Sequence, residues 1–560
     1  MTALLRPAAA ARASLIFRGL NIWELLRLRA RATGSGIAFV WQPFHGAAKT
    51  WTYADLQRDS ASLAAGLARR GIRAGDKVLI HLENCPEFVL AWYACAAVGA
   101  VAVATNTRAS DDELSYYVAH SEPSGIITQP RFHERMQRCA PHVQWIVSTD
   151  HDGGVGAEAL VEPDSALASL FDDPDRLIPA PIDPLAPMCV QYTSGTTARP
   201  KAVLWTHANA LWGARINAAH EGLRPDDCFL CYLPLFHTNA LAYTMLASLW
   251  VGSRFVLVPK WSTSRFWELS VSHRCTWVNL ILLSFRAIET LPRPKHHCFR
   301  FFGAGVCDLE WDAPLGIKSI GWWGMTETIT TPIIGDLYTP NRPGSMGRPA
   351  PEYGVAIVRP DGQPVEPDET GDLLIFGTPG LSLFAEYLHD EAATAASFDD
   401  RGWFRTGDRA TLHADGHLSF AGRAKDMLKV GGENVAAVEI ESATMTAPRI
   451  REAAVVACAD PVLDEVPVAF VIVAGDADGV EAEVVAACRE RLADFKVPRA
   501  VYAVRALPRS TLGKVNKAEL RAVAGPDADR CAAEAVWAAA AGSDPSGEHM
   551  DAANEKGPVR

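Results

Sequence analysis

Helical and strand-like patterns alternate along the first part of the chain, and this alternation constrains the fold more than any other feature. Helical periodicity occurs at 53–70, 87–98 and 112–119. Short apolar runs, typical of buried strands, occur at 77–81, 101–104 and 125–128. Such alternation predicts an α/β fold with a largely parallel sheet. The same texture resumes after residue 186 and continues to about Gly321.

Changes in composition and in the expected secondary structure divide the rest of the chain. Short strands separated by Gly, Pro and Asp predict a small β subdomain at about 340–422. We therefore expect a large N-terminal domain at 1–424, with two parallel-type αβ subdomains and this β subdomain. A mixed segment at 425–523 predicts a separate small α+β domain. The tail at 524–560, rich in Ala, Asp and Gly, is predicted to be disordered.

The charge balance and the longest uncharged run exclude some classes of protein. The formal net charge is -12, which argues against a nucleic-acid binder, because such proteins usually carry a basic face. Residues 88–107 approach the ~20 apolar residues of a membrane span. The run contains Cys95, Gly99 and many Ala, and it divides into a helix that ends near Val98 and a strand at 101–104. We therefore expect no membrane span.

The 12 cysteines show no repeated spacing. Cys228 and Cys231 form a lone C-x-x-C, whereas zinc binding or redox work would need a second pair or a suitable βαβ context. We interpret them as buried apolar cysteines of a reducing compartment, and expect a cytoplasmic protein. The Ala- and Arg-rich N-terminus could be a transit peptide. We favour a frayed tail followed by an amphipathic helix at 22–30.

A loop at 193–198 contains only small or hydroxylated residues, and Arg199 and Lys201 follow it. Backbone N–H groups and hydroxyls in such a loop can approach a polyphosphate closely. An ordinary Ser/Thr-rich turn would look similar. The G-K-[ST] ending of a Walker A loop is missing. The loop is therefore a candidate phosphate site of another kind.

Two glycine-containing segments suit a nucleotide. G-A-G at 303–305 follows an aromatic strand predicted at 299–302, and glycines there would let backbone approach a flat ring. G-W-W-G-M-T-E at 321–327 offers an aromatic stacking face and, in its Thr-Glu pair, oxygen ligands for Mg²⁺. A structural turn containing two core tryptophans is the alternative for the second segment.

Three further segments lie nearer the C-terminus. Asp408 is placed at the end of a short strand, where a carboxylate can accept both hydroxyls of a ribose. G-R-A-K-D-M at 422–427, with Gly431 and Gly432, is interpreted as a hinge linker, although an inert solvated linker would look alike. Lys514 ends the segment L-P-R-S-T-L-G-K, which on its own would be a surface loop.

In their order and spacing, these segments resemble the adenylate-forming superfamily, which includes acyl-CoA synthetases, adenylation domains of peptide synthetases, and luciferases. The resemblance covers about 22–523. It is nearest to the bacterial carnitine/crotonobetaine-CoA ligase group, around M-T-E-T-I and I-I-G-D. It implies that ATP, Mg²⁺ and coenzyme A are bound, and that the small domain rotates about a hinge between two half-reactions.

The resemblance also implies roles for individual residues. The loop that grips the β- and γ-phosphates would contain Thr193, Ser194, Gly195, Thr196, Thr197 and Lys201. The adenine site would contain Gly303, Ala304, Gly305, Trp323, Gly324 and Met325. Thr326 would contact the α-phosphate and Glu327 would bind Mg²⁺. Asp408 and Arg423 would bind the ribose, and Lys425 would be the hinge. Gly431 and Gly432 would line the pantetheine tunnel, and Lys514 would be the lysine that serves the adenylation step.

The implied reaction joins a carboxylic acid to ATP, forming acyl-AMP and pyrophosphate, and then transfers the acyl group to CoA. Two departures from the family pattern are Ala198 and Ala202 in place of Gly, and Trp323 where Tyr is commoner. His237, which we also place among the catalytic residues, would line the acyl pocket with Phe236 and Trp322.

An aromatic pocket suits an apolar fatty, cyclic or bulky acid, and equally a quaternary ammonium acid such as carnitine, through cation–π contacts. Alternatives are an acyl-AMP ligase that loads a carrier protein, and an inactive nucleotide-binding scaffold. A homodimer is the assembly we consider for this chain.

Overall fold

The computed structural model describes residues 15–153, 155–156, 165–193, 200–289, 291–308, 312–423, 426–430, 433–460, 463–492, 494–509 and 514–524. The described residues of Met1–Thr406 and Ala410–Phe420 form one compact unit. Those of Gly407–Arg409 and Ala421–Arg560 form a second.

A nine-stranded sheet in the first unit carries most of the candidate site. Its order is β17-β16-β15-β14-β13-β11-β12-β1-β2. The strands are β1 (Ile37–Trp41), β2 (Lys49–Thr52), β11 (Cys228–Cys231), β12 (Arg254–Leu257), β13 (Trp277–Asn279), β14 (Phe301–Ala304), β15 (Lys318–Trp323), β16 (Ile333–Ile334) and β17 (Arg348–Pro349). The neighbours from β15 to β1 are parallel, so their carboxyl ends share one edge.

A second sheet of the first unit has the order β20-β10-β9-β4-β3-β5-β6. Its strands are β3 (Lys77–His81), β4 (Val101–Ala104), β5 (Gly125–Thr128), β6 (Ile146–Ser148), β9 (Pro187–Thr193), β10 (Lys201–Thr206) and β20 (Glu386–Tyr387). The strands β9, β4, β3, β5 and β6 are parallel. β10 runs antiparallel to β9 and β20. Two sheets with parallel cores confirm the predicted fold class.

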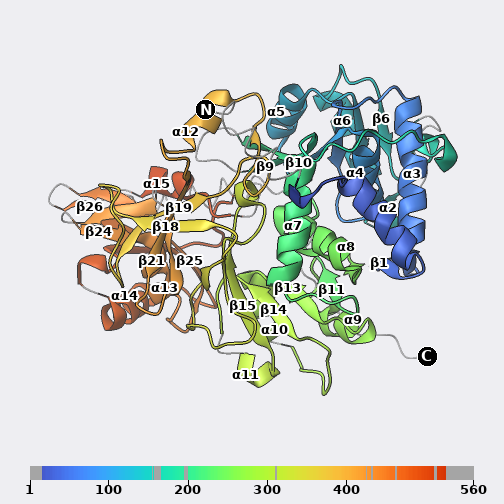
Figure 1. Ribbon diagram of the computed structural model, residues 1–560. Helices are drawn as coiled ribbons and strands as arrows, with labels where there is room; N and C mark the ends of the chain where they lie inside the picture. Colours follow the sequence, from blue (N-terminus) through green and yellow to red (C-terminus); the bar gives the residue numbers. More distant parts are fainter. Residues whose placement is uncertain are drawn as a thin grey trace, which may run out of the picture. The chain divides into compact units, whose positions relative to one another are not determined.

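The predicted helices form close to their expected bounds. They are α2 (Ile22–Thr33), α3 (Tyr53–Arg69), α4 (Pro86–Val98), α5 (Asp111–Ser121) and α7 (His207–His220). Helices α2, α3 and α4 pack against one another (Figure 1). Helix α4 and strand β4 are buried over nearly their whole surface, which explains the long uncharged run that contains them. No helix within the described residues is long and apolar enough to cross a bilayer.

The small β subdomain is a four-stranded sheet in the order β18-β19-β21-β22. Its strands are β18 (Gly354–Val358), β19 (Thr370–Phe376), β21 (Phe404–Leu412) and β22 (Leu418–Arg423). The second unit contains a five-stranded sheet of β23 (Met427–Val430), β24 (Glu433–Ala436), β25 (Ile450–Asp460), β26 (Asp464–Val473) and β27 (Ala500–Ala503). It also contains the helices α13 (Ala437–Thr444), α14 (Val480–Arg491) and α15 (Lys517–Val523).

Three local expectations differ from the structure. Strand β14 includes Gly303 and Ala304, which we expected to follow it, because both pair with β15. Asp408 lies inside the nine-residue strand β21 rather than at the end of a short strand. Parts of the stretch predicted as a linker lie in strands, because Gly422 and Arg423 end β22 and Met427 begins β23. In each case pairing with a neighbouring strand overrides the local preference of Gly and polar residues for loops.

Candidate active site

Four adjacent parallel strands end at the same edge of the nine-stranded sheet, and candidate residues follow each of them. His237 lies six residues beyond β11, and Asn279 ends β13. Gly305 follows β14, and the segment 324–327 follows β15. Ligands of open α/β sheets bind outside the carboxyl ends of the strands. The topology therefore collects residues that are far apart in the sequence at one candidate site.

Thr238 connects this edge to the second sheet. Its hydroxyl lies 3.0 Å from Oε1 of Gln191, on β9, and 3.2 Å from Oγ1 of Thr326. Trp205, on β10, donates its Nε1–H to the carbonyl of Thr326 at 2.9 Å. Both contacts place Thr326 beside the strands that flank the phosphate-loop candidate. The predicted loop residues Ser194, Gly195, Thr196 and Thr197 lie outside the described residues.

Glu327 is a buried carboxylate, with 4% of its surface exposed. It lies in a 3-10 turn, η5 (Thr326–Thr328). The hydroxyl of Tyr387 donates to its Oε1 at 3.0 Å. Burial, followed by the nearby Glu327 charge, raises the pKa of Tyr387 far above its ordinary value, so the phenol keeps the proton that it donates. Nζ of Lys201 lies 4.3 Å from the centroid of the Tyr387 ring. Tyr387 was not among the residues selected from the sequence.

The donors at this position fit a magnesium ion bound together with a nucleotide. Mg²⁺ prefers oxygen ligands and usually takes one or two carboxylates plus substrate phosphates. Glu327 supplies a carboxylate and Thr326 a neighbouring hydroxyl. Within the described ranges, no group of three or more His, Cys, Asp or Glu is arranged to hold a metal ion. Phosphate oxygens of a nucleotide and water could complete the coordination of Mg²⁺ beside these two residues.

Trp322, rather than Trp323, is the tryptophan that covers Gly303. A Cβ added to Gly303 would lie 1.8 Å from Cη2 of Trp322, so only glycine fits beneath that ring. A Cβ at Gly305 would meet nothing within 4 Å, which leaves space beside this backbone. Trp323, which we expected to stack on adenine, is 7% exposed and packs into the main hydrophobic core. Successive residues of a strand face opposite sides, which explains why the two rings diverge.

A π-helix, η4 (Asn239–Leu246), forms the wall next to Trp322. π-Helical turns are rare and frequently occur at functional sites. Tyr243 of η4 meets Trp322 edge to face, with 5.7 Å between the ring centroids. Asn279 donates its side-chain N–H to Oδ1 of Asn239 at 2.7 Å. The predicted pocket residues Phe236 and His237 precede this helix, with ring centroids 4.7 Å apart.

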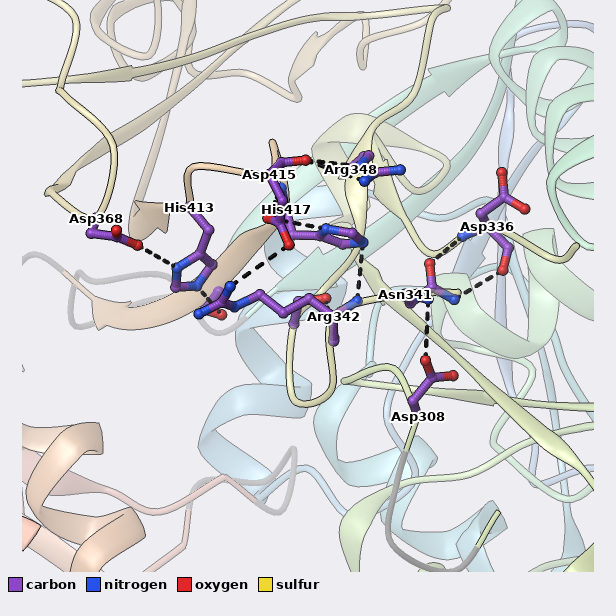
Figure 2. Close-up of polar contacts among 11 residues, drawn as sticks. Asp308, Asp336, Asn341, Arg342, Arg348, Asp368, His413, Asp415 and His417 are labelled. Atoms are coloured by element: carbon purple, nitrogen blue, oxygen red, sulfur yellow. Dashed lines mark hydrogen bonds and ion pairs between the residues drawn. The ribbon is translucent and has the colours of Figure 1, made fainter. Parts of the chain in front are cut away.

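A network of polar contacts holds the segment that follows Gly305 in the chain. Oδ1 of Asn341 accepts a hydrogen bond from the backbone N–H of Asp336 at 2.7 Å. The backbone N–H of Asn341 donates to Oδ2 of Asp308 at 3.2 Å. The backbone N–H of Arg342 donates to Nε2 of His417 at 3.1 Å. Figure 2 shows that these contacts join the turn at 413–417 of the β subdomain to the segment that ends at Asp308. They therefore hold the backbone at Asp308, three residues after Gly305.

The remaining predicted residues belong to the second unit or are not described. Asp408, Arg423 and Lys514 lie in the second unit. Lys425, Gly431 and Gly432 lie outside the described residues. Three site residues were missed in the sequence: Tyr387, Thr238 and Gln191. Tyr387 contacts Glu327, and Thr238 contacts Gln191 and Thr326, across separations of 47 or more positions, so no local pattern connects them.

Comparison with protein families decides which group the chain belongs to. The sequence model of the family described as AMP-binding enzyme matches residues 26–388. The sequence model of the family described as AMP-binding enzyme C-terminal domain matches residues 439–514. The chain belongs to the AMP-binding enzyme family. This confirms the resemblance seen in the motifs at 303–305, 321–327 and 507–514.

Individual relatives agree with the family. A crotonobetaine/carnitine–CoA ligase of Citrobacter koseri is 31% identical over 525 residues, covering 90% of this chain and all of that protein. The corresponding ligase of an Escherichia coli strain is 32% identical, covering 90% and 98%. The structure of o-succinylbenzoate coenzyme A synthetase from Bacillus subtilis, in complex with ATP and magnesium ion, has a TM-score of 0.77 at 28% identity, covering 90% and 99%.

Proposed function

We propose that this chain activates a carboxylic acid at the carboxyl edge of the nine-stranded sheet and transfers it to CoA. The family makes it an AMP-forming acid–thiol ligase that uses ATP, Mg²⁺ and CoA. The observation that carries the assignment of the site is Glu327, a buried carboxylate oriented by Tyr387 and next to Thr326. It follows β15, whose parallel neighbour β14 leads to the open backbone at Gly305.

The residues at this edge account for the first half-reaction. A carboxylate is a poor electrophile, because its leaving group would be oxide. Its attack on the α-phosphate of ATP forms a mixed anhydride and expels pyrophosphate. Both reactants are anions, so the site has to hold them in line and neutralise their repulsion. Thr326 is proposed to contact the α-phosphate, and Glu327 to hold Mg²⁺, which screens the phosphates. Lys201 begins the strand that leaves the phosphate loop and supplies a cation beside Tyr387.

The second half-reaction transfers the acyl group from AMP to the thiol of CoA. In this proposal Lys514 acts only in the first half-reaction, where it contacts the carboxylate and the phosphate that become joined. Asp408 and Arg423 bind the ribose. Gly431 and Gly432 are proposed to let the pantetheine arm pass close to the backbone, and Lys425 is proposed as the hinge.

The acid is proposed to be an apolar fatty, cyclic or bulky acid. Support comes from the wall formed by Trp322 and Tyr243, whose edge-to-face rings give a rigid aromatic surface. A second candidate is an acid that carries a quaternary ammonium group, which the same aromatic faces could bind through cation–π contacts. The relatives from Citrobacter koseri and Escherichia coli, which are named crotonobetaine/carnitine–CoA ligases, favour this second candidate.

Product analysis separates these possibilities. The purified protein would be given ATP, Mg²⁺, CoA and a mixture of apolar acids and trimethylammonium acids, and the products identified by mass spectrometry. We expect AMP and one or a few acyl-CoA species. Acyl-adenylate without acyl-CoA would indicate a ligase that loads a carrier protein. Absence of pyrophosphate release with every acid would overturn the proposed function in favour of a nucleotide-binding scaffold.

Lys514→Ala tests the division of labour between the half-reactions. We expect loss of acyl-adenylate formation by about a hundredfold or more, because removing one positioned electrostatic contact typically costs that much. Thioester formation from preformed acyl-adenylate and CoA should be largely kept. Lys517→Ala, which removes a lysine that pairs with Glu441, is the matched control. Equal loss of both half-reactions in Lys514→Ala would contradict the role.

The cellular location and the oligomeric state complete the proposal. We place the protein in the cytoplasm, which the free cysteines among the described residues support, since a reducing compartment keeps thiols unpaired. A homodimer is the assembly we propose to test by size-exclusion chromatography with light scattering.

A further inference from the structure

A strained turn follows directly after Glu327. The backbone N–H of Thr330 donates to the carbonyl of Thr328 at 2.6 Å, which closes a γ-turn around Ile329. Ile329 has φ 63° and ψ −39°. This form of the γ-turn is rare and strained, and a positive φ is an outlier for a β-branched residue. Ile329 is also completely buried. The surrounding structure must therefore hold it in place.

The Tyr353 hydroxyl is the main clamp on this turn. It donates to the carbonyl of Thr328 at 2.9 Å. It also lies 2.7 Å from Oγ1 of Thr330 and accepts the Nε1–H of Trp212 at 2.9 Å. A phenol has one proton and two lone pairs. One donation and two acceptances therefore use its whole hydrogen-bonding capacity, on both sides of Ile329.

Other contacts enclose the turn. A Cβ added to Gly213 of α7 would lie 3.1 Å from Cγ2 of Ile329, so the helix approaches the isoleucine closely. The hydroxyl of Tyr243 donates to the carbonyl of Thr330 at 3.3 Å. His220, at the end of α7, lies 3.0 Å from Oγ1 of Thr331 and 3.0 Å from Oε2 of Glu352. The turn is thus held from α7, from η4 and from the segment before β18.

The turn has a direct effect on the residues proposed to bind Mg²⁺ and phosphate. The hydroxyl of Thr328 receives the backbone N–H of Met325 at 3.0 Å, so 325 and 328 close a loop around Thr326 and Glu327. We propose that Tyr353 is a positioning residue for adenylation, whose hydroxyl holds the strained turn and thereby sets the orientation of Thr326 and Glu327. This inference rests on the proposed function of the site.

Tyr353→Phe tests the proposal, because it removes the hydroxyl and keeps the ring. We expect acyl-adenylate formation to slow tenfold or more, and the Mg²⁺ concentration for half-maximal rate to rise. The thioester step from supplied acyl-adenylate and CoA should stay within about twofold. The additional thermal stabilisation by ATP that depends on Mg²⁺ should also shrink, which gives a binding readout without turnover.

Tyr53→Phe is the matched control. Tyr53 is a buried tyrosine of the same unit, and its hydroxyl contacts the carbonyls of Ser248 and Ser253. Its removal should lower stability similarly without a change in either half-reaction or in Mg²⁺ dependence. Trp212→Phe removes the indole N–H that Tyr353 accepts, together with part of the buried ring. It should act in the same direction as Tyr353→Phe, and the double variant should lose less than the product of the single effects.

The possible outcomes are distinct. If the unsubstituted enzyme releases no pyrophosphate with any acid, the proposed function fails. If the enzyme is active and Tyr353→Phe behaves like Tyr53→Phe, the positioning role is wrong. Equal slowing of both half-reactions by Tyr353→Phe would also overturn it, because a general loss of folding would explain that result. Should Tyr353→Phe not fold, Trp212→Phe decides by the same criteria.

Discussion

At the scale of single residues, Glu327 shows how the fold prepares a charge for use. A buried carboxylate is costly unless neighbouring groups stabilise it. Here the Tyr387 hydroxyl donates to one oxygen, and the Phe384 backbone N–H donates to the Glu327 carbonyl at 2.8 Å. Side chain and backbone are therefore both held from the segment 384–387. In the proposed role of Glu327, such preorganisation would let Mg²⁺ bind without rearrangement of its ligand.

Glu327→Gln should separate charge from shape. The amide keeps the size of the side chain and an oxygen for Tyr387, but loses the negative charge that attracts Mg²⁺. We expect pyrophosphate release to fall by about a hundredfold, which corresponds to about 3 kcal/mol. Rates measured over a range of Mg²⁺ concentrations would show a raised requirement. Glu386→Gln, one residue before Tyr387 and on the opposite face of β20, should behave like the unsubstituted enzyme.

At the scale of elements, α7 links the two sheets to the β subdomain. Its N-cap, Thr206, ends β10 and accepts the N–H of Asn209 at 3.0 Å, while the Thr206 hydroxyl donates to the carbonyl of Gly380 at 2.7 Å. The far end of the helix carries His220, which contacts Thr331. Along its length Trp212 and Gly213 face the strained turn. One helix therefore connects β10, which follows the phosphate-loop candidate, to the segment of the proposed magnesium ligand.

Thr206→Ala should destabilise the first unit by about 2 kcal/mol, at the upper end of the range for N-caps, because a buried bond to Gly380 is lost as well. Urea unfolding followed by tryptophan fluorescence suits this test, since all tryptophans except Trp537 precede residue 407. Ser110→Ala removes the exposed capping box of α5 and should cost about half as much or less. A loss for Thr206→Ala no greater than for Ser110→Ala would show that the Gly380 bond adds nothing.

At the scale of the whole molecule, buried histidines make stability depend on pH. Burial lowers the pKa of His207 to about 4. Burial, aided by the charges of Arg135 and Arg131, lowers the pKa of His81 to about 3. Unfolding exposes both rings, whose pKa then returns to about 6.5. Between these values the unfolded state binds more protons than the folded state, so stability falls as the pH falls below about 6.5.

The expected loss is about 1.4 kcal/mol per pH unit for each histidine, and it ends once the pH passes below the folded-state pKa. His81→Leu should remove one histidine's share of this slope between pH 6 and 4, even though the contact from His81 Nδ1 to Thr105 at 2.9 Å is lost. Unfolding midpoints in urea at several pH values measure the slope. Substitution of the exposed His45 by Asn should leave the slope unchanged, and an unchanged slope in His81→Leu would contradict the prediction.

Local patterns in the sequence predicted much of this protein. Apolar runs such as 77–81 and 101–104, and the N-cap Thr206, predicted their elements, because strand burial and helix capping depend on residues close in the chain. The order of the glycine, Thr-Glu and Gly-Lys segments predicted the family. The magnesium role of Glu327 and the adenylation role of Lys514 remain predictions, which the substitutions above test.

Only the tertiary structure decided how the site is built. The sequence by itself determined that two tryptophans precede the Thr-Glu pair, but the pleat of β15 placed Trp322 over Gly303 and Trp323 in the core. It determined that Ile329 follows the pair, but packing against α7 and hydrogen bonds from Tyr353 forced a strained turn on it. The physical reason is the same in both cases. These conformations depend on partners that are distant in the chain, and the free energy of those contacts outweighs the local preference of each residue.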